Sequence, residues 1–530
     1  MIALLDAAGA RSLDRYTSEH TGIPSLCLME RAALAAADEI CRMAGKDPLI
    51  RRNGIFVLAG TGNNGADGIA AARILKQRGF RCHAAALGDP AHASVQWQMQ
   101  VKIFAAVGGV LSPAEGDLNA AIPSGFALYV DALFGTGLSR PLTGAAARAA
   151  ERLNAAAAET EGAKILAVDI ASGISASDGS VQGAAVRADV TVTFGPPKIG
   201  QFLYPGALYS GRVVPAEIGL DLDGWMRAPD SEKEDGARAL ELRDAAAMLP
   251  RRRPDGNKGT FGTVLVIAGA AGMAGAACLA SAAALRGGAG LVKTVTSEKN
   301  RLVLQTLVPE AVMAGTLEER AGLERLIPAV KAVVIGPGLS RNADARAALG
   351  LVVSLHGEIP VVFDADALNL LAGEPELPVL GPQCVLTPHP GELARLLHTD
   401  TAEVKRRGIR ACARELAAQT GAAVAAKDAR TWTIVPGGAE YLNLTGNDGC
   451  GTGGSGDVLA GLTGGILAGG SAPQQAVPAA VWFHGLAGDL AARDRGKRGM
   501  TSRDICDHIP EALRTGDECR PDGREMDDEF

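Results

Sequence analysis

Two glycine-rich segments of this 530-residue sequence carry side chains suited to nucleotide chemistry. The first, TGNNGADG at 61–68, follows the apolar run GIFVLAG. Its glycines permit a tight turn and let main-chain N–H groups approach a phosphate at the start of a helix. As a plain G-x-G-x-x-G pattern it also fits an NAD-binding turn, with Asp89 as the ribose acid, or a turn capped by asparagine. The amides of Asn63 and Asn64, with Asp67, favour a site that needs oxygen donors.

Two further apolar runs end in polar groups that could join this loop. DALFGTGL begins with Asp131, and DIASG begins with Asp169 and contains Ser172. Each aspartate alone is more often a strand-end cap, but three converging clusters favour a site. Amide, carboxylate and hydroxyl oxygens suit an alkali or alkaline-earth ion better than zinc. The sequence therefore predicts a nucleotide and cation site in its first half.

The second glycine-rich segment, GNDGCGTGGSGDVL at 446–459, opens a helical run. Gly453, Gly454 and Gly456 leave main-chain amides uncovered, so they can form an anion hole for a transferring phosphoryl group. Asp457 in the first helical turn can take a proton from a substrate hydroxyl as general base. The sequence has no Walker A pattern, which disfavours a P-loop enzyme. A glycine-rich connection with an aspartate cap is the alternative.

Polar residues also follow several other apolar runs in the second half. In TPHPGE, two prolines flank His389 and hold its ring outward, so a ligand contact is favoured over a satisfied polar group. Glu392 lies three residues further on. The remaining candidates at the ends of apolar runs are Lys258, the glycine turn 269–276, Gly336 to Gly338, Asp364, Asp366 and Lys427.

These clusters end short β-rich runs that alternate with alanine-rich helical stretches along nearly the whole chain. Such alternation predicts an α/β protein with mainly parallel sheets flanked by helices, where ligands bind at the carboxyl ends of strands. The candidate strands lie within 54–60, 126–135, 164–172, 188–195, 263–269, 332–338, 359–366 and 384–392. A polar, charged stretch divides the chain, so we expect domains at 1–222 and 244–515, a linker at 223–243 and a charged tail at 516–530.

The composition excludes several classes of function. With 52 basic and 59 acidic residues the net charge is −7, whereas a nucleic-acid or membrane-surface protein would show a basic stripe. Aromatic residues make up 4%, too few for base-stacking platforms, and the 47% of hydrophobic residues supports real cores. We therefore expect small-molecule partners, no nucleic acid and no membrane. The alanine-rich helices suit close packing in a core or an interface, which is compatible with a homo-oligomer.

Cysteine usage and the N-terminal segment favour the cytoplasm. Nine cysteines are scattered without a C-x-x-C pair, as in proteins of reducing compartments, and MIALLDAAGARSLD lacks the basic region of a signal peptide. A charge-free stretch between Lys258 and Arg286 is long enough for a membrane helix. Because glycines interrupt it, we expect a buried strand and helix there instead.

The first-half motifs LCLMERA, GTGNNGADGIAAARIL, VDALFGTGLSR, VDIASG and TFGPPKIGQFLYPGALYSG resemble the NAD(P)H-hydrate epimerase family, the YjeF N-terminal domain, over about residues 1–222. The resemblance implies a Rossmann-like fold, K⁺ bound by Asn64, Asp131 and Ser172, and a catalytic, substrate-contacting Asp169. It also implies hydrated-nucleotide contacts from Asn63, Asn64, Gly65, Ala66, Asp67, Gly135, Thr136, Gly137, Leu138, Ser139, Arg140 and Pro141. Epimerisation needs C–O cleavage and re-addition through a ring cation, which a nearby carboxylate can stabilise.

The second-half motifs are similar to the NAD(P)H-hydrate dehydratase family, of ribokinase-like fold, over about residues 244–510. They include IGPGL, FDADALNLL, LTPHPGELARLL, GTGGSGDVLAGLTGGILAGG and WFHGLAGDLAA. The resemblance implies that Asp457 is catalytic and that Ala276, Gly338, His389 and Asp457 contact the substrate. It implies ADP contacts from Lys427, Asp428, Ala429, Arg430, Thr431, Gly454, Ser455 and Gly456. Glu392 is a candidate for orienting Mg²⁺.

Together the two resemblances imply a bifunctional repair enzyme. One domain would interconvert the R and S hydrates of NADH and NADPH, and the other would dehydrate the S form at the expense of ADP. Phosphorylation turns hydroxide, a poor leaving group, into phosphate, which explains a kinase-like fold in a dehydratase. The alternatives are a ribokinase-like vitamin or sugar kinase with a nucleotide-binding regulatory domain, and a first domain that binds nucleotide without catalysis. Main-chain amides do not specify phosphate number, so ADP and ATP remain open.

Overall fold

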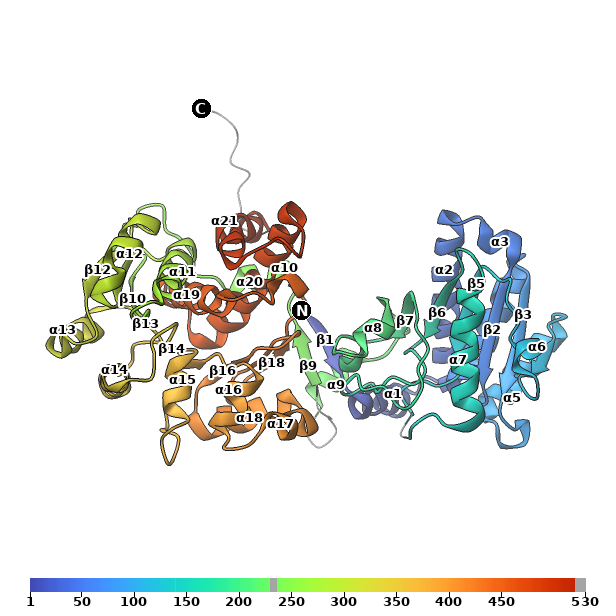
Figure 1. Ribbon diagram of the computed structural model, residues 1–530. Helices are drawn as coiled ribbons and strands as arrows, with labels where there is room; N and C mark the ends of the chain where they lie inside the picture. Colours follow the sequence, from blue (N-terminus) through green and yellow to red (C-terminus); the bar gives the residue numbers. More distant parts are fainter. Residues whose placement is uncertain (139, 229–235, 520–530) are drawn as a thin grey trace. The chain divides into compact units, whose positions relative to one another are not determined.

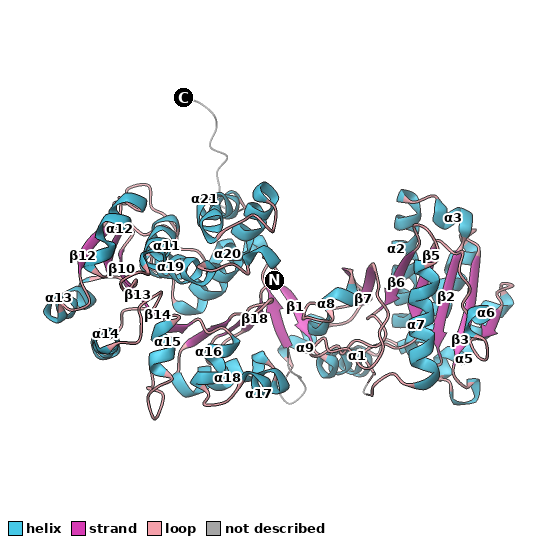
Figure 2. Ribbon diagram, in the orientation of Figure 1, coloured by secondary structure: helices cyan, strands magenta, loops and turns pink. Residues whose placement is uncertain are grey.

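The computed structural model describes residues 1–138, 140–228 and 236–519. The chain forms two compact units, Ala3–Ala237 and Arg238–Phe530, with Met1–Ile2 grouped with the second (Figure 1). In each unit helices alternate with strands along the chain (Figure 2). This is the consequence of apolar β-rich runs that alternate with alanine-rich stretches.

The first unit is built on a seven-stranded sheet whose paired strands are all parallel. Its strand order is β4-β3-β2-β5-β6-β7-β8, so the order reverses between β2 and β5. Ligands bind at such a switch point, beyond the carboxyl ends of the strands. The strands are β2 (Ile55–Gly60), β3 (Cys82–Leu87), β4 (Leu111–Pro113), β5 (Leu128–Ala132), β6 (Lys164–Val168), β7 (Val190–Phe194) and β8 (Arg212–Ala216).

Helices cover both faces of this sheet because alternate residues of each strand are apolar on either side. In β2, Ile55 and Val57 pack in a core with α2, α4 and α5, whereas Phe56 and Leu58 pack with α7. The helices are α1 (Ala7–Thr21), α2 (Ser25–Lys46), α3 (Leu49–Asn53), α4 (Asn63–Gln77), η1 (Pro90–His92), α5 (Val95–Ala106), α6 (Leu118–Ala121), α7 (Gly144–Ala158), η2 (Ile199–Gln201), α8 (Ala207–Ser210) and α9 (Leu222–Arg227).

The second sheet has the strand order β1-β9-β18-β17-β16-β15-β14-β13-β10-β11-β12, and its strands β10 to β18 belong to the second unit. Strands from β12 to β16 pair in parallel, and β17 pairs antiparallel with β16 and β18. The strands are β1 (Ile2–Leu5), β9 (Gly236–Ala239), β10 (Thr263–Ile267), β11 (Leu291–Val295), β12 (Val312–Gly315), β13 (Ala332–Ile335), β14 (Val361–Phe363), β15 (Cys384–Leu386), β16 (Ala423–Ala426), β17 (Trp432–Ile434) and β18 (Glu440–Leu442).

The main chains of two helices in this unit, α11 and α19, are in direct contact. A methyl group added to Gly461 of α19 would lie 2.1 Å from the carbonyl oxygen of Ala280 in α11, and one on Gly465 would lie 2.5 Å from that of Ala284. The alanine and glycine content of these helices therefore serves close packing. The helices are α10 (Leu242–Met248), α11 (Ala274–Arg286), η4 (Glu298–Asn300), α12 (Arg301–Leu307), α13 (Arg320–Leu326), η5 (Ile327–Ala329), α14 (Ala343–Leu355), α15 (Asp366–Leu371), α16 (Pro390–Leu396), α17 (Thr401–Arg407), α18 (Ile409–Thr420), η6 (Asp448–Cys450), α19 (Ser455–Ala468), α20 (Pro473–Arg495) and α21 (Ser502–Glu518).

All eight candidate strands contain a strand of the structure, and the charge-free stretch forms β10 and α11 as expected. Among the described residues, no helix combines the length and apolar character needed to cross a membrane. The expected linker at 223–243 includes most of α9, β9 and the start of α10, while its residues 229–235 lie outside the described part. Of the expected tail, 516–518 belong to α21 and 520–530 are not described.

Candidate active sites

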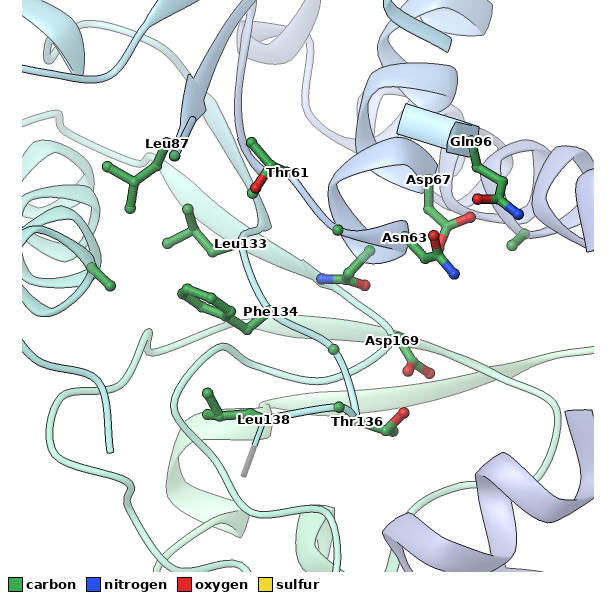
Figure 3. Close-up of a pocket in the computed structure, with 18 of the residues that line it drawn as sticks. Thr61, Asn63, Asp67, Leu87, Gln96, Leu133, Phe134, Thr136, Leu138 and Asp169 are labelled. Carbon is green, nitrogen blue, oxygen red and sulfur yellow. The ribbon is translucent and has the colours of Figure 1, made fainter. Parts of the chain in front are cut away.

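A pocket of about 1130 Å³ opens at the carboxyl ends of β2, β5 and β6, the switch point of the first sheet. Thr61 follows β2, Leu133 and Phe134 follow β5, and Asp169 follows β6, and all four surround it (Figure 3). Its volume is slightly above the range of about 300–1,000 Å³ common for small-molecule sites. The pocket can therefore hold a ligand as large as a dinucleotide.

Glycines bring α4 directly onto the strands beneath this pocket. A methyl group on Gly65 would lie 1.8 Å from the carbonyl oxygen of Gly60, and one on Gly68 would lie 2.3 Å from Cβ of Ala132. Asn63 and Asn64 are the first two residues of α4, whose N-cap Gly62 provides no side-chain cap. The amides of the first turn, which lack partners within the helix, therefore face the pocket with the two asparagines.

Asp131 and Ser172 form a buried hydrogen-bonded pair. The Ser172 hydroxyl donates to Asp131 Oδ1 at 2.7 Å, and its main-chain N–H donates to Oδ2 at 2.8 Å. Burial raises the pKa of Asp131 to about 6, against these hydrogen bonds, which lower it. No described residue forms an ion pair with Asp131, so its charge when ionised has no partner in the described part of the chain.

Asn64 lies against the loop that follows β5. Its side chain is 3.3 Å from the position of a methyl group on Gly135, and Gly135 follows Phe134, whose N–H donates to Ser172 Oγ at 2.9 Å. The buried Nδ2 of Asn64 has no hydrogen-bond partner. If the amide oxygen and nitrogen of Asn64 exchanged positions, its carbonyl oxygen would take the place of the Nδ2 that has no partner. An uncompensated carboxylate, a hydroxyl and an orphaned amide together fit a bound cation of the K⁺ type.

Asp169 sits in a left-handed conformation with φ of 66° and pairs with a lysine that the sequence analysis did not single out. Lys198 Nζ lies 2.5 Å from Asp169 Oδ1, with side-chain exposures of 3% and 14%. Lys198 also donates to Thr193 Oγ1 and the Phe194 carbonyl, each at 3.0 Å. A non-glycine residue with positive φ is strained, so the surrounding contacts hold this carboxylate in place.

Two further carboxylates, those of Asp14 and Asp67, line the same pocket as Asp169. Burial raises the pKa of Asp67 well above its usual value, and the charges of Asp169 and Asp14 raise it further. Burial and Asp169 also raise the pKa of Asp14, opposed by Lys198. Because their pKa values are raised, Asp14 and Asp67 hold a proton more readily than exposed carboxyl groups do, as a general acid must.

Most of the residues predicted for this site line the pocket. Those that do are Asn63, Asn64, Asp67, Gly135, Thr136, Gly137, Leu138, Arg140 and Asp169. Gly65 and Ala66 are buried beneath it, Pro141 does not line it, and Ser139 is outside the described residues. Asp89, the candidate ribose acid, caps η1 and pairs with His92 instead. Lys198 could have been found from the motif TFGPPKIG, whereas Asp14 of α1 lacks a motif of its own.

The second site forms around the N-terminus of α19. Gly454, its N-cap, has φ of 92°, and a methyl group there would lie 2.6 Å from Leu279 Cδ1. A methyl group on Gly456 would lie 3.2 Å from Lys427 Nζ, so the glycine lets this ammonium group approach the turn. Asp457 is the third residue of the helix. The uncovered amides of the first turn and the ammonium group of Lys427 therefore lie close together, as an anion site would require.

Three carboxylates surround Lys427 in this unit. Its Nζ lies 2.7 Å from Asp364 Oδ1 and 4.0 Å from Glu392 Oε2, and Thr387 Oγ1 donates to Asp364 at 2.6 Å. Burial lowers the pKa of Lys427, but Asp364 and Glu392 raise it overall. Burial raises the pKa of Asp457 to about 7, with a contribution from Asp364 and opposition from Lys427.

His389 and Glu392 have structural roles besides any ligand contact. His389 is the N-cap of α16, and its Nδ1 accepts from the N–H of Gly391 at 3.0 Å. Glu392 completes a capping box by accepting from the His389 N–H at 2.8 Å. Because Nδ1 is an acceptor, the neutral ring carries its proton on Nε2, 3.3 Å from Glu392 Oε1. Burial raises the pKa of Glu392 to about 7.

Of the other predicted residues of the second site, Gly338 and the segment 427–431 lie on loops, and Ala276 lies in α11. Gly338, with φ of 54°, stands against Ala276, whose Cβ would be 2.9 Å from a methyl group on that glycine. The segment 427–431 joins β16 to β17, with Asp428 and Ala429 exposed. Arg430 donates to the Leu444 carbonyl at 2.8 Å. Of this segment, Lys427 is the residue that approaches the turn before α19.

His484 of α20 contacts the glycine-rich turn at the start of α19. The sequence analysis quoted the motif that contains this histidine but did not single it out. Its Nε2 lies 3.0 Å from the Ser455 carbonyl and 3.3 Å from the Ser455 hydroxyl. Burial lowers the pKa of His484 to about 4, so it is neutral at physiological pH and donates to the carbonyl. Within the described ranges, no group of three or more His, Cys, Asp and Glu side chains is arranged to hold a metal.

Comparisons with known proteins give a separate family match for each half of the chain. Residues 264–511 match the family model described as NAD(P)H-hydrate dehydratase, and residues 25–200 match that of the YjeF-related protein N-terminus. A solved ADP/ATP-dependent NAD(P)H-hydrate dehydratase from Bacillus subtilis, co-crystallized with ATP and Mg²⁺, is 31% identical. It covers 53% of this chain and 99% of its own, with a TM-score of 0.47.

Full-length relatives match both units at once. The bifunctional NAD(P)H-hydrate repair enzyme of Moorella thermoacetica is 37% identical over 97% of this chain and 97% of its own length. That of Thermofilum pendens is 37% identical over 95% and 94%, and that of Escherichia coli is 33% identical over 93% and 90%. The fold class and the resemblance found in the sequence are confirmed, and the chain belongs to the family of bifunctional NAD(P)H-hydrate repair enzymes.

Proposed function

We propose that the two reactions of this family are divided between the two sites described above. The first unit epimerises the R and S hydrates of NADH and NADPH at Asp169, and the second dehydrates the S hydrate at Asp457 with ADP as phosphoryl donor. The observation that carries this assignment is that each unit holds a glycine-rich turn beside a buried lysine–carboxylate pair. These pairs are Asp169 with Lys198 and Asp364 with Lys427.

In the first unit the chemistry breaks and re-forms one C–O bond. A protonated carboxyl group, for which Asp67 is placed, gives its proton to the ring hydroxyl, which leaves as water while the ring nitrogen supplies electrons. Asp169 stabilises the resulting ring cation, and Lys198 holds that carboxylate in place. Water then adds to either face of the ring cation and returns a proton to Asp67, so atoms and charge balance.

We propose that K⁺ is held by Asp131, Ser172 and Asn64. The buried carboxylate without an ion-pair partner and the orphaned Asn64 amide support this assignment. A cation there would supply positive charge at the ends of β5 and β6 and would order the loop from Phe134 onward, which contacts Ser172. Gly135 to Leu138 of this loop line the pocket, so the ion would shape the nucleotide site.

K⁺ should therefore stabilise the protein in a pH-dependent way. The raised pKa of Asp131 means that its neutral form stabilises the fold fully below about pH 3.8, and that this stabilisation is lost as pH rises through about 6. K⁺ compensates the ionised form, so replacing Na⁺ by K⁺ at tenfold its Kd should add about 1.4 kcal/mol, or roughly 3–6 °C in Tm. Thermal unfolding at about pH 8 should show this rise, and at about pH 5 a smaller one.

Asp131→Asn is the matched variant for this measurement because it removes the charge and keeps the shape. It should abolish the difference between K⁺ and Na⁺ at both pH values. A K⁺-dependent rise that survives in Asp131→Asn would contradict the site.

In the second unit we propose that Asp457 removes the proton from the ring hydroxyl, whose oxygen attacks the terminal phosphorus of the nucleotide. The first-turn amides of α19 receive the charge on the transferring group, and Lys427 neutralises part of it. The C–O bond then breaks with its electrons leaving on phosphate, and the adjacent ring carbon loses a proton. This restores the double bond of NAD(P)H and yields phosphate and the shortened nucleotide.

Mg²⁺ would be oriented by Glu392, with Asp364 as a second carboxylate beside it. Three carboxylates against one lysine leave an excess of negative charge that a divalent cation bound to phosphate would balance. Mg²⁺ usually keeps several waters and takes one or two protein carboxylates plus phosphates, which agrees with the lack of a closed ligand cluster in the described residues. The ion would supply electrostatic stabilisation of the phosphoryl group.

The dehydration rate should depend on pH through Asp457. Only its ionised form can accept the proton, and its pKa is about 7. Below that pH the kcat for dehydration should fall about tenfold per unit, and above it the rate should level off. Rates measured from about pH 5 to 9 with saturating S hydrate and nucleotide check this. A rate that stays flat across neutrality would exclude Asp457 as the base.

The decisive assay incubates the purified chain with hydrated NADPH, Mg²⁺, K⁺ and either ADP or ATP. We expect the absorbance of the nicotinamide band to return, with the R hydrate consumed as well as the S hydrate. Phosphorylation of a stable vitamin or sugar alcohol without elimination would favour the kinase alternative. Binding without exchange of R and S would reduce the first unit to a nucleotide-binding module.

We also propose a cytoplasmic location. All nine cysteines are free thiols, four of them buried, as is typical of proteins that work in a reducing compartment.

A further inference from the structure

The pocket of the first unit has two chemically different ends. Asp67 and Asp169 lie on one side of it, and Leu87, Leu133 and Leu138 lie on the other (Figure 3). The leucine side is continuous with α7, because these leucines share an apolar cluster with residues of that helix, Ala146 among them. A nucleotide whose hydrated ring meets the carboxylates therefore extends toward the first turns of α7.

Two arginines line the pocket near α7 without a counter-charge. Arg140 precedes the helix and Arg148 lies in its second turn, and both are exposed. No described residue forms a hydrogen bond or ion pair with either, whereas Arg152, one turn further along, is paired with Glu159. Arginines that face a pocket with free donors are suited to a phosphate, which they bind with two parallel hydrogen bonds.

The same end of the pocket provides further groups that suit a phosphorylated ribose. Thr143, the N-cap of the 15-residue helix α7, lines the pocket and makes no side-chain cap, so its hydroxyl and the first-turn amides are open. Glu115 also lines the pocket. In dinucleotide sites an acidic residue binds the ribose 2′-hydroxyl of NAD, and a nearby arginine accommodates the 2′-phosphate of NADP.

We propose that Arg140 and Arg148 form the subsite for the 2′-phosphate of hydrated NADPH, with Glu115 facing the ribose hydroxyl of hydrated NADH. This inference rests on the proposed epimerase function and names the residues that distinguish its two substrates. The pyrophosphate, which both substrates share, lies between the two ends, at the glycine turns 60–64 and 135–138. The arginines thus contribute to one substrate and not to the other.

The test compares both hydrates in Arg148→Gln and Arg140→Gln. We expect kcat/KM for epimerisation of hydrated NADPH to fall about tenfold or more, mainly through KM, because a charge-assisted hydrogen bond is lost. For hydrated NADH it should stay within about twofold. An equal loss with both substrates would place the arginines on the pyrophosphate and overturn the proposal, as would no loss with either.

A matched control is Arg11→Gln, which removes a positive charge from the same pocket on α1, the helix of Asp14. This variant should change both substrates by the same factor. If it selects against hydrated NADPH as strongly as Arg148→Gln, the effect comes from overall charge and the subsite is wrong. Arg11, Arg140 and Arg148 are all exposed, and glutamine is a good helix former, so the three variants should fold.

Inhibition provides a second readout that does not depend on turnover of a particular hydrate. Adenosine 2′,5′-bisphosphate should inhibit epimerisation less well in Arg148→Gln, by about tenfold, while adenosine 5′-phosphate should be unaffected. Dehydration of S-hydrated NADPH by the same preparation should not change. A wild-type chain that exchanges neither hydrate would defeat the proposed function itself, whereas one that exchanges both with unselective variants defeats only the subsite.

Discussion

Asp457→Asn should lower kcat for dehydration by about 10²–10⁴-fold, the usual contribution of a general base, and leave epimerisation unchanged. The amide keeps the shape of the carboxylate and cannot accept the hydroxyl proton. Folding should not suffer, because a pKa raised to about 7 shows that the buried site already favours a neutral group. Stopped assays with S-hydrated NADPH and nucleotide measure the first effect, and urea unfolding measures the second.

Asp344→Asn is a suitable control for this substitution. Asp344 lies in the first turn of α14 and is exposed. Its replacement should leave both activities within about twofold, as is usual for surface substitutions. If Asp457→Asn retained a tenth or more of the dehydration rate, another group of the site would have to accept the proton. Asp364 would be the next candidate.

Asp169→Asn should have the opposite effect, with epimerisation reduced by about 10²–10⁴-fold and dehydration of the S hydrate retained. The reason is the loss of the carboxylate that faces the developing ring cation. Here the structure adds a consequence for stability. Lys198 is only 3% exposed, so removing its partner leaves a buried charge unpaired at a cost of about 3–5 kcal/mol. Rates of R/S exchange must therefore be measured well below the unfolding temperature of the variant.

The double variant Asp169→Asn, Lys198→Met separates the two effects. It removes the buried charge together with its partner, so much of the lost stability should return. Epimerisation should stay as low as in the single variant. Recovery of exchange along with stability would mean that Asp169 acts only through the fold, and loss of dehydration in either variant would count against independent sites.

The sequence predicted those parts of the sites that follow directly from strand ends. Asp131, Asp169 and Ser172 each follow an apolar run, and the parallel order of β2, β5 and β6 brings them to one edge of the sheet. The bond between Asp131 and Ser172 extends this prediction, since two polar groups that are buried together must satisfy each other. The alternation of apolar runs with helical stretches, together with the turn residues, is thus sufficient to locate polar side chains at the ends of regular strands.

Side chains that reach the sites from irregular segments or distant helices were not predicted. Lys198 lies just before the short helix η2, and Asp14 comes from α1, where helical spacing alone does not say which face meets the pocket. Glu392 shows a different limit, because its capping of α16 could be inferred from sequence spacing, but its position 4.0 Å from Lys427 depends on the pairing of β15 with β16. The sequence alone does not determine which strands pair with one another when they lie far apart along the chain.

The backbone contact between α11 and α19 has a consequence for how the second active site could be remodelled. Gly461 touches the Ala280 carbonyl oxygen with no side chain in between, one turn beyond Asp457. Because the main chains of the two helices are in direct contact, no side chains lie between them that could rearrange and let one helix shift. Attempts to broaden the substrate range would do best to vary the surrounding loops, while the helix serves as a fixed reference point.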